Sequence, residues 1–193
     1  MRVHASLGDI ALLAIMATIS AVALAMKSPA QAAHPLTNPE LATDHELLES
    51  RQLLIPVQGV ERKALRDNFD ERRSAGHKHE ALDIMAPRGT PVLAVGDGKV
   101  AKLFKSVAGG LTVYQFDADE KFAYYYAHLD RYAPGLQQGQ ALKRGEVLGY
   151  VGSTGNAPPS APHLHFTIFR LGPDKRWWVG TAINPYPFLV ATR

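Results

Sequence analysis

The stretch HLHFTIFR, residues 163–170, has the composition of a β-strand, because its aromatic and β-branched residues favour extended backbone. Side chains two residues apart in a strand point to the same face of the sheet. His163 and His165 are therefore expected to face one site. Imidazole is the commonest metal ligand and the side chain that titrates nearest neutral pH. Such a pair can supply one metal ligand together with one acid–base or electrophilic group.

Short apolar segments separated by glycine, proline and polar residues precede this strand. They predict a mainly β fold, an antiparallel sheet domain of short strands and glycine-rich loops over residues 56–193. The expected strands are residues 82–85, 91–95, 99–104, 111–116, 122–127, 146–151 and 165–170. Gly96-Asp97-Gly98 is a turn signal, and it predicts a hairpin between the second and third of these strands.

The N-terminal residues have the pattern of an export signal. Arg2 precedes an almost wholly apolar run over residues 10–26, and the small-x-small triplet Ala30-Gln31-Ala32 follows it. Residues 1–32 are therefore expected to be a signal peptide, and the protein to be exported to the periplasm or cell envelope. The run is also close to the shortest length that spans a membrane. An uncleaved signal anchor, which would attach the protein to the membrane, is the alternative.

Residues 33–55 are expected to form a linker with a short helix. Asn38-Pro39-Glu40 has the pattern of an N-cap, a first-position proline and an acidic first turn. Leu41, Leu47 and Leu48 then form an apolar stripe that ends near Arg51. Residues 34–75 could also cover the site and keep it latent, which the sequence does not decide.

The composition limits the kinds of site and partner. The chain of 193 residues contains no cysteine, so a metal site must use His, Asp or Glu, and no disulfide stabilises an exported form. The net charge of +3 is too small to indicate nucleic-acid binding.

His79 and Asp83 could complete a site, since imidazole and carboxylate are both good zinc ligands. In a regular strand, residues four apart are separated by about 13 Å. His79 must therefore curl back from a loop while Asp83 enters the strand 82–85. Taken alone, this pair is better explained as a surface ion pair.

His128 follows the aromatic run Tyr124-Tyr125-Tyr126 at the end of an expected strand. By itself it is compatible with an ordinary strand-end histidine, and the tyrosines with sheet packing. The histidines His4, His34 and His45 fall in the signal, linker or helix, and we assign them no role.

Four ordered motifs resemble the lysostaphin-type, or LytM-like, zinc metalloendopeptidases of bacterial cell walls. HEALDIMAPRGTPVLAVGDGKV, residues 79–100, is similar to the family's H-x-G-x-D segment and the strand that follows it. Tyr126-Ala127-His128-Leu129 is similar to its Y-x-H-L segment. GEVLGYVGSTGNAPPSAPHLHF, residues 145–166, is similar to its glycine-rich stretch ending in HLHF, and Ile183-Asn184-Pro185 to its closing INP. The resemblance covers roughly residues 56–188.

The resemblance implies an enzyme that binds one zinc ion and hydrolyses peptide bonds in the stem or cross-link peptides of peptidoglycan. It implies that the zinc ligands are His79, Asp83 and His165 and that the catalytic histidines are His128 and His163, without deciding which is the base. The family usually has glycine where this chain has Ala81. If that position needs a positive φ, alanine is strained by about 1 kcal/mol.

The same residues are compatible with other functions and other kinds of site. Some LytM-like modules have lost their metal ligands, bind the cell wall and activate another hydrolase, but all five positions are occupied here. A structural zinc site would normally be closed by four ligands. Ser153 lacks the sequence context of a nucleophile elbow, which excludes serine catalysis. Trp177-Trp178, with the loops around residues 124–126 and 152–156, could wall a substrate groove; edge packing of the last hairpin explains the tryptophans equally well.

Overall fold

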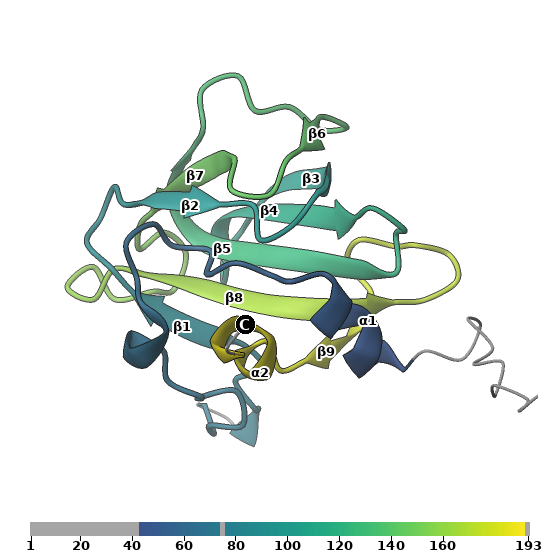
Figure 1. The fold of residues 1–193 in the computed structure, drawn as a ribbon. Coiled ribbons are helices and arrows are strands. Elements are labelled where there is room, and N and C mark those ends of the chain that lie inside the picture. The colour runs from purple at the N-terminus through teal and green to yellow at the C-terminus, as the bar shows by residue number, and fades with distance from the viewer. Residues whose placement is uncertain (1–42, 74–75, 192–193) are drawn as a thin grey trace, which may run out of the picture. The chain divides into compact units, whose positions relative to one another are not determined.

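The computed structural model describes residues 43–73 and 76–191, and Figure 1 shows their fold. The described residues belong to one compact unit that is built on a nine-stranded sheet. The expected signal segment over residues 1–32 lies outside them. Within the described residues, no helix is both long and apolar enough to span a membrane.

Every ladder of the sheet is antiparallel, which confirms the predicted fold class. The strand order is β1-β8-β5-β4-β3-β6; β9 pairs with β8, and β7 pairs with both β2 and β5. The strands are β1 Leu82–Met85, β2 Pro91–Leu93, β3 Gly98–Ser106, β4 Gly110–Asp117, β5 Phe122–Tyr132, β6 Ala141–Leu142, β7 Val147–Val151, β8 His163–Leu171 and β9 Gly180–Ile183.

The predicted hairpin across Gly96-Asp97-Gly98 is wrong. β2 pairs with β7, whereas β3 pairs with β4 and β6. Gly98 serves close packing instead: a Cβ there would lie 2.0 Å from the Phe116 carbonyl oxygen. The Gln115 side chain donates a hydrogen bond to the Gly96 carbonyl at 2.7 Å. The segment therefore carries the chain from one part of the sheet to the other.

Alternation along β8 and along the part of β5 before His128 separates a core face from a site face. Tyr124 and Tyr126 on β5 and Phe166 on β8 belong to the main hydrophobic core and are at most 1% exposed. Tyr125 and His165 lie on the opposite face, where their ring centroids are 6.1 Å apart. The apolar pattern of the strands thus turns the histidines of β8 away from the core.

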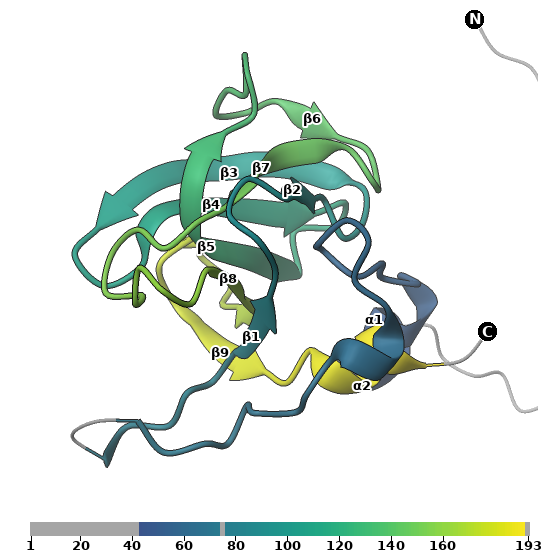
Figure 2. The ribbon, with the colours of Figure 1, turned by 90° about the vertical axis from the view of Figure 1, so that its left-hand side faces the viewer.

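Two short helices lie beside each other at one side of the sheet (Figures 1 and 2). They are α1 Asp44–Ser50 and α2 Tyr186–Val190, and η2 Arg62–Ala64 is a single 3₁₀ turn. The His45 and Phe188 rings join α1 to α2, with centroids 5.1 Å apart.

Helix α1 starts at Asp44 because Thr43 and Glu46 form a capping box, with each side chain accepting from the other's backbone N–H. Asn38, the expected N-cap, lies outside the described residues. Leu48 and Leu53 belong to the same core as the sheet. The segment expected as a linker thus packs against the domain, and the core begins before residue 56.

Candidate metal centre and its histidines

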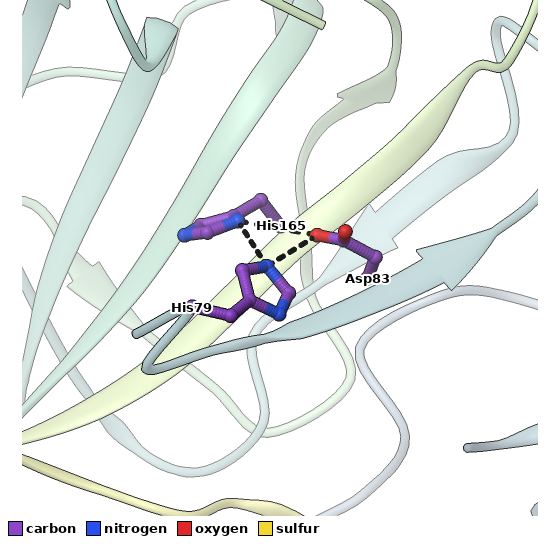
Figure 3. A group of neighbouring side chains, drawn as sticks. All are labelled: His79, Asp83 and His165. Carbon is purple, nitrogen blue, oxygen red and sulfur yellow. Dashed lines mark hydrogen bonds and ion pairs between the residues drawn. The ribbon is translucent and has the colours of Figure 1, made fainter. Parts of the chain in front are cut away.

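Three side chains from two distant parts of the sequence converge on one point, as Figure 3 shows. His79 lies in the loop before β1, Asp83 lies in β1, and His165 lies opposite Asp83 in the β1–β8 ladder. His79 Nε2 is 2.9 Å from Asp83 Oδ1 and 3.1 Å from His165 Nδ1. The third distance, from His165 Nδ1 to Asp83 Oδ1, is 3.2 Å.

The loop before β1 curls back as the i, i+4 spacing requires. Glu80 takes a left-handed conformation with φ 54°, while Ala81 keeps an ordinary φ and is fully buried. Backbone hydrogen bonds from His79 N to Glu71 O and from Glu80 N to Phe69 O, both 2.8 Å, hold the curl. The strain expected if Ala81 needed a positive φ therefore does not arise there; Glu80 bears it instead.

Hydrogen bonds with Asn68 and Arg73 orient His79 and Asp83. His79 Nδ1–H donates to the Asn68 carbonyl at 3.0 Å, which leaves Nε2 free to ligate. The Asn68 side-chain oxygen accepts from Asp83 N at 3.3 Å. Arg73 Nη2 lies 2.5 Å from Asp83 Oδ2, so Oδ1 alone faces the two imidazoles.

The three donors fit a zinc ion. Ligand atoms about 2.0–2.2 Å from zinc in tetrahedral geometry lie about 3.3–3.6 Å from one another. The observed separations are slightly shorter, and all three atoms lie within 4.8 Å of one another. Burial raises the pKa of Asp83, but hydrogen bonds with His165 and His79 outweigh it and hold the pKa well below its usual range. The carboxylate is therefore ionised, as a ligand must be.

His163 lies beside this cluster, on the same face of β8 as His165. Its Nδ1–H donates to the Ala161 carbonyl at 2.8 Å, and its Nε2 lies 3.6 Å from Asp83 Oδ1. The ring is therefore turned so that its second nitrogen faces the ligands. The prediction that both histidines of β8 face one site agrees with this geometry.

A bulge in β5 turns His128 toward the same point. Between the pairs Val113↔Tyr126 and Leu111↔Leu129, β5 contains one residue more than β4. His128 has φ 60° at this bulge. Its ring centroid lies 4.9 Å from that of His163 and 5.5 Å from that of His165.

Two glycine-containing turns hold His128 in place. Its Nδ1–H donates to the Thr154 carbonyl at 2.8 Å, and its backbone N–H donates to the Gly109 carbonyl at the same distance. The Thr154 hydroxyl donates to the Leu129 carbonyl at 2.7 Å and accepts from Leu111 N at 2.9 Å.

The five side chains border one open hollow of about 300 Å³. Its lining residues are Arg73, His79, Asp83, His128, Asn156, Ala157, Pro158, His163 and His165. Burial lowers the pKa of His128 to about 4, against the hydrogen bond to Thr154, so its ring is neutral at pH 7. The hollow thus joins an ionised carboxylate to a neutral imidazole.

Sequence reasoning missed the groups that orient these side chains. Asn68, Thr154 and Ala161 act mainly through backbone carbonyls, which any residue has, so their types carry no signal. Arg73 is one basic residue in a charged segment. Only Gly155 gave a sequence signal, because a glycine after Thr154 indicates a tight turn. In the structure Gly155 has φ +77°, and a Cβ there would lie 2.2 Å from the Ala108 carbonyl oxygen.

The antiparallel sheet thus presents three candidate metal ligands beside two imidazoles that are oriented through their Nδ1–H groups. Comparison with known proteins gives the class of the protein, a peptidase, and its family. The chain belongs to peptidase family M23, whose model matches residues 77–185.

Among characterised relatives, L-Ala–D-Glu endopeptidase of Bacillus subtilis (strain 168) is 34% identical over 128 residues, covering 63% of this chain and 38% of that protein. Lysostaphin of Staphylococcus simulans is 32% identical over 115 residues, covering 59% of this chain and 22% of that protein. The chain therefore spans well under half the length of either relative.

Solved structures agree with this. The catalytic domain of lysostaphin from Staphylococcus simulans matches with a TM-score of 0.52 at 32% identity, over 61% of this chain and 83% of that one. LytU matches with a TM-score of 0.54 at 29% identity, over 65% of this chain and 83% of that one. The lysostaphin-type resemblance drawn from the four motifs is confirmed.

Proposed function

We propose that the protein is an exported zinc metalloendopeptidase that hydrolyses peptide bonds in the stem or cross-link peptides of peptidoglycan. The observation that carries the proposal is the completeness of the site: three donors form an open centre, and two additional imidazoles face the same hollow. The names of the relatives, an L-Ala–D-Glu endopeptidase among them, support the substrate class.

The zinc ligands in this proposal are His79, Asp83 and His165. Zinc in such a site polarises a carbonyl group and makes water a nucleophile at neutral pH. A catalytic zinc takes three protein ligands and keeps one position open. Among the described residues, three side chains form the candidate metal-binding group, as a site with one open position requires.

His128 serves as the general base. Its neutral ring is fixed through Nδ1–H, so the lone pair of Nε2 accepts the proton of the attacking water. The proton then passes to the amine nitrogen as the C–N bond breaks. His163, whose Nε2 faces the ligands, shares in this transfer. Once its Nε2 has taken up a proton, that N–H donates to the oxygen on which negative charge develops.

The second candidate is a non-catalytic module that binds the cell wall and activates another hydrolase. Loss of a metal ligand or of a catalytic histidine would favour it. Neither has occurred, and the hydrogen bonds from His128 and His163 to backbone carbonyls orient both rings. We therefore place the enzyme first.

Export through residues 1–32, with membrane attachment if that segment is not cleaved, is part of the proposal. Its support is the apolar run and the small-x-small triplet that follows it. Fractionation of the native host, with the N-terminus of the mature protein sequenced, distinguishes a cleaved signal peptide from an anchor.

Clearing of a suspension of purified peptidoglycan tests the function. The zinc-loaded protein should lower the turbidity, a chelator should stop it, and added zinc should restore it. Undiminished clearing by metal-free protein would contradict the mechanism. A protein that binds zinc and peptidoglycan yet releases no peptide fragments would support the activator instead.

A further inference from the structure

A row of aromatic rings leads away from the metal centre along the site face of the sheet. The Tyr125 ring centroid lies 6.1 Å from that of His165 and 4.6 Å from that of Tyr114. Trp177 continues the row, with its ring centroid 4.8 Å from Tyr114. The row ends at two rings that both contact Trp177. We call the whole set the aromatic track: Phe104, Tyr114, Tyr125, Trp177 and Trp178.

The outer end of the aromatic track is open to solvent. Trp178 is 60% exposed and Phe104 is 40% exposed, although large aromatic side chains are normally well buried. Phe104 lies on β3 and Trp178 lies in the segment between β8 and β9, whereas Tyr124 and Tyr126 on the other face of β5 are in the core. Both exposed rings contact Trp177, so they gather at one place on the surface, as apolar side chains do at a binding surface. Packing of Trp177 on Phe104 and Tyr114 therefore explains only one of the two tryptophans.

Hydrogen-bonding side chains accompany the rings. Lys102 Nζ lies 5.8 Å from the centre of the Trp177 ring. Beyond Trp177 lies a hollow of about 360 Å³ whose wall includes Lys99, Gln138 and Lys175. Ligand pockets begin at about 300 Å³, so this hollow has room for one small ring with its substituents. Flat aromatic faces beside amide and ammonium donors suit a ligand that is apolar on its ring faces and polar at its edges.

We propose that the aromatic track binds the glycan strand of peptidoglycan, with the pyranose rings of N-acetylated amino sugars stacked on Trp178 and Phe104. The inference rests on the proposed function, which places a stem peptide in the hollow at His165. The sugars to which such a peptide is attached then extend outward from that hollow. The C–H faces of a pyranose match an indole face, whereas small and charged stem-peptide side chains do not. Lys102 and Gln138 donate to acetamido and hydroxyl oxygens.

The test is binding to peptide-free glycan strands, which contain no bond that the proposed enzyme can cut. Co-sedimentation with insoluble, peptide-stripped glycan is measured for the full protein and for Trp178→Ala and Phe104→Ala. The wild type should bind, and each variant should bind about tenfold more weakly, as loss of one stacked ring requires. Tyr150→Ala is the matched control, because Tyr150 is an aromatic residue that stacks on Arg131, outside the track. It should bind like the wild type.

Cleavage of a short, sugar-free stem peptide is measured on the same proteins. If the wild type cuts the peptide but glycan binding is absent or unchanged in both variants, the aromatic track proposal is overturned and the proposed function stands. If the wild type does not cut the peptide, the proposed function fails on its own readout. Vesicles containing phosphatidylglycerol provide a second arm. Binding to them that depends on Trp178, without binding to glycan, would make the track a membrane surface and overturn the proposal.

Discussion

The Nδ1–H of His128 donates to the carbonyl oxygen of Thr154 at 2.8 Å, which leaves the second nitrogen of that ring to the hollow. The Thr154 hydroxyl anchors this carbonyl between two strands, through Leu129 O and Leu111 N. A residue that touches no reacting atom thus sets the orientation of the proposed base. Such orienting contacts around a metal centre affect activity strongly.

Thr154→Val should lower kcat about tenfold or more, because loss of the hydroxyl frees the carbonyl that orients His128. KM and zinc content should change little, since Thr154 contacts none of the proposed ligands. Thr154→Ser keeps the hydroxyl and should restore most of the activity. Steady-state cleavage of a stem peptide, with zinc measured on the same samples, checks this. A serine variant as slow as the valine variant would contradict it.

The turn that faces Thr154 gives a second prediction. Gly110 has φ +64°, and a Cβ there would lie 2.2 Å from Thr154 Oγ1. Gly110→Ala should therefore lower the free energy of unfolding by about 2–4 kcal/mol, from backbone strain and overpacking together. Gly135 has φ +77° with nothing within 4 Å, so Gly135→Ala should cost only the strain, about 1 kcal/mol. Denaturant unfolding of both variants measures the difference; equal losses would mean that the contact with Thr154 is not tight.

The curl before β1 gives a third prediction. Glu80 has φ 54°, and Ala81 is buried with an ordinary φ. Glu80→Gly should raise the free energy of unfolding by about 0.5–1 kcal/mol, because relief of strain exceeds the entropy lost by glycine. Ala81→Gly should lower it by about 1 kcal/mol, although the family usually has glycine there. Thermal unfolding of the two variants checks this, and the reverse order would place the strain at Ala81.

The roles of the histidines on β8 give a fourth prediction. His165→Ala should lose zinc and activity together. His163→Ala should keep most of its zinc and lose about 10²–10⁴-fold in kcat, as removal of an acid–base group does. Metal analysis of dialysed protein, paired with peptide cleavage, separates the two outcomes. Zinc loss in His163→Ala, with zinc retained in His165→Ala, would show that the two roles are exchanged.

Simple strand alternation predicts much of this site. It places His163 and His165 on one face, and the i, i+4 spacing of His79 and Asp83 requires the curl that the loop forms. Alternation alone would have sent His128 into the core with Tyr126, because both are an even number of residues from Tyr124. The bulge that turns His128 to the site face depends on how β5 pairs with β4. Local sequence preferences do not predict that pairing.

Local sequence patterns also failed to predict which strands pair over long distances in the sequence. The chain bends at Gly96-Asp97-Gly98, but Gly98 packs closely against β4 and no hairpin is closed there. β2 pairs instead with β7, which is distant in the sequence, so no local pattern indicates this partner. The orienting carbonyls of Asn68 and Thr154 have no side-chain signature, so only coordinates locate them.

We propose that the protein hydrolyses peptide bonds of peptidoglycan with zinc bound by His79, Asp83 and His165. Mass spectrometry of peptidoglycan digested by the purified protein tests this most directly. We expect fragments with new amino and carboxyl ends at one stem or cross-link peptide bond. They should form with about one zinc per chain and disappear after chelation. The same fragments from metal-free protein, or cleavage at glycosidic bonds alone, would contradict it.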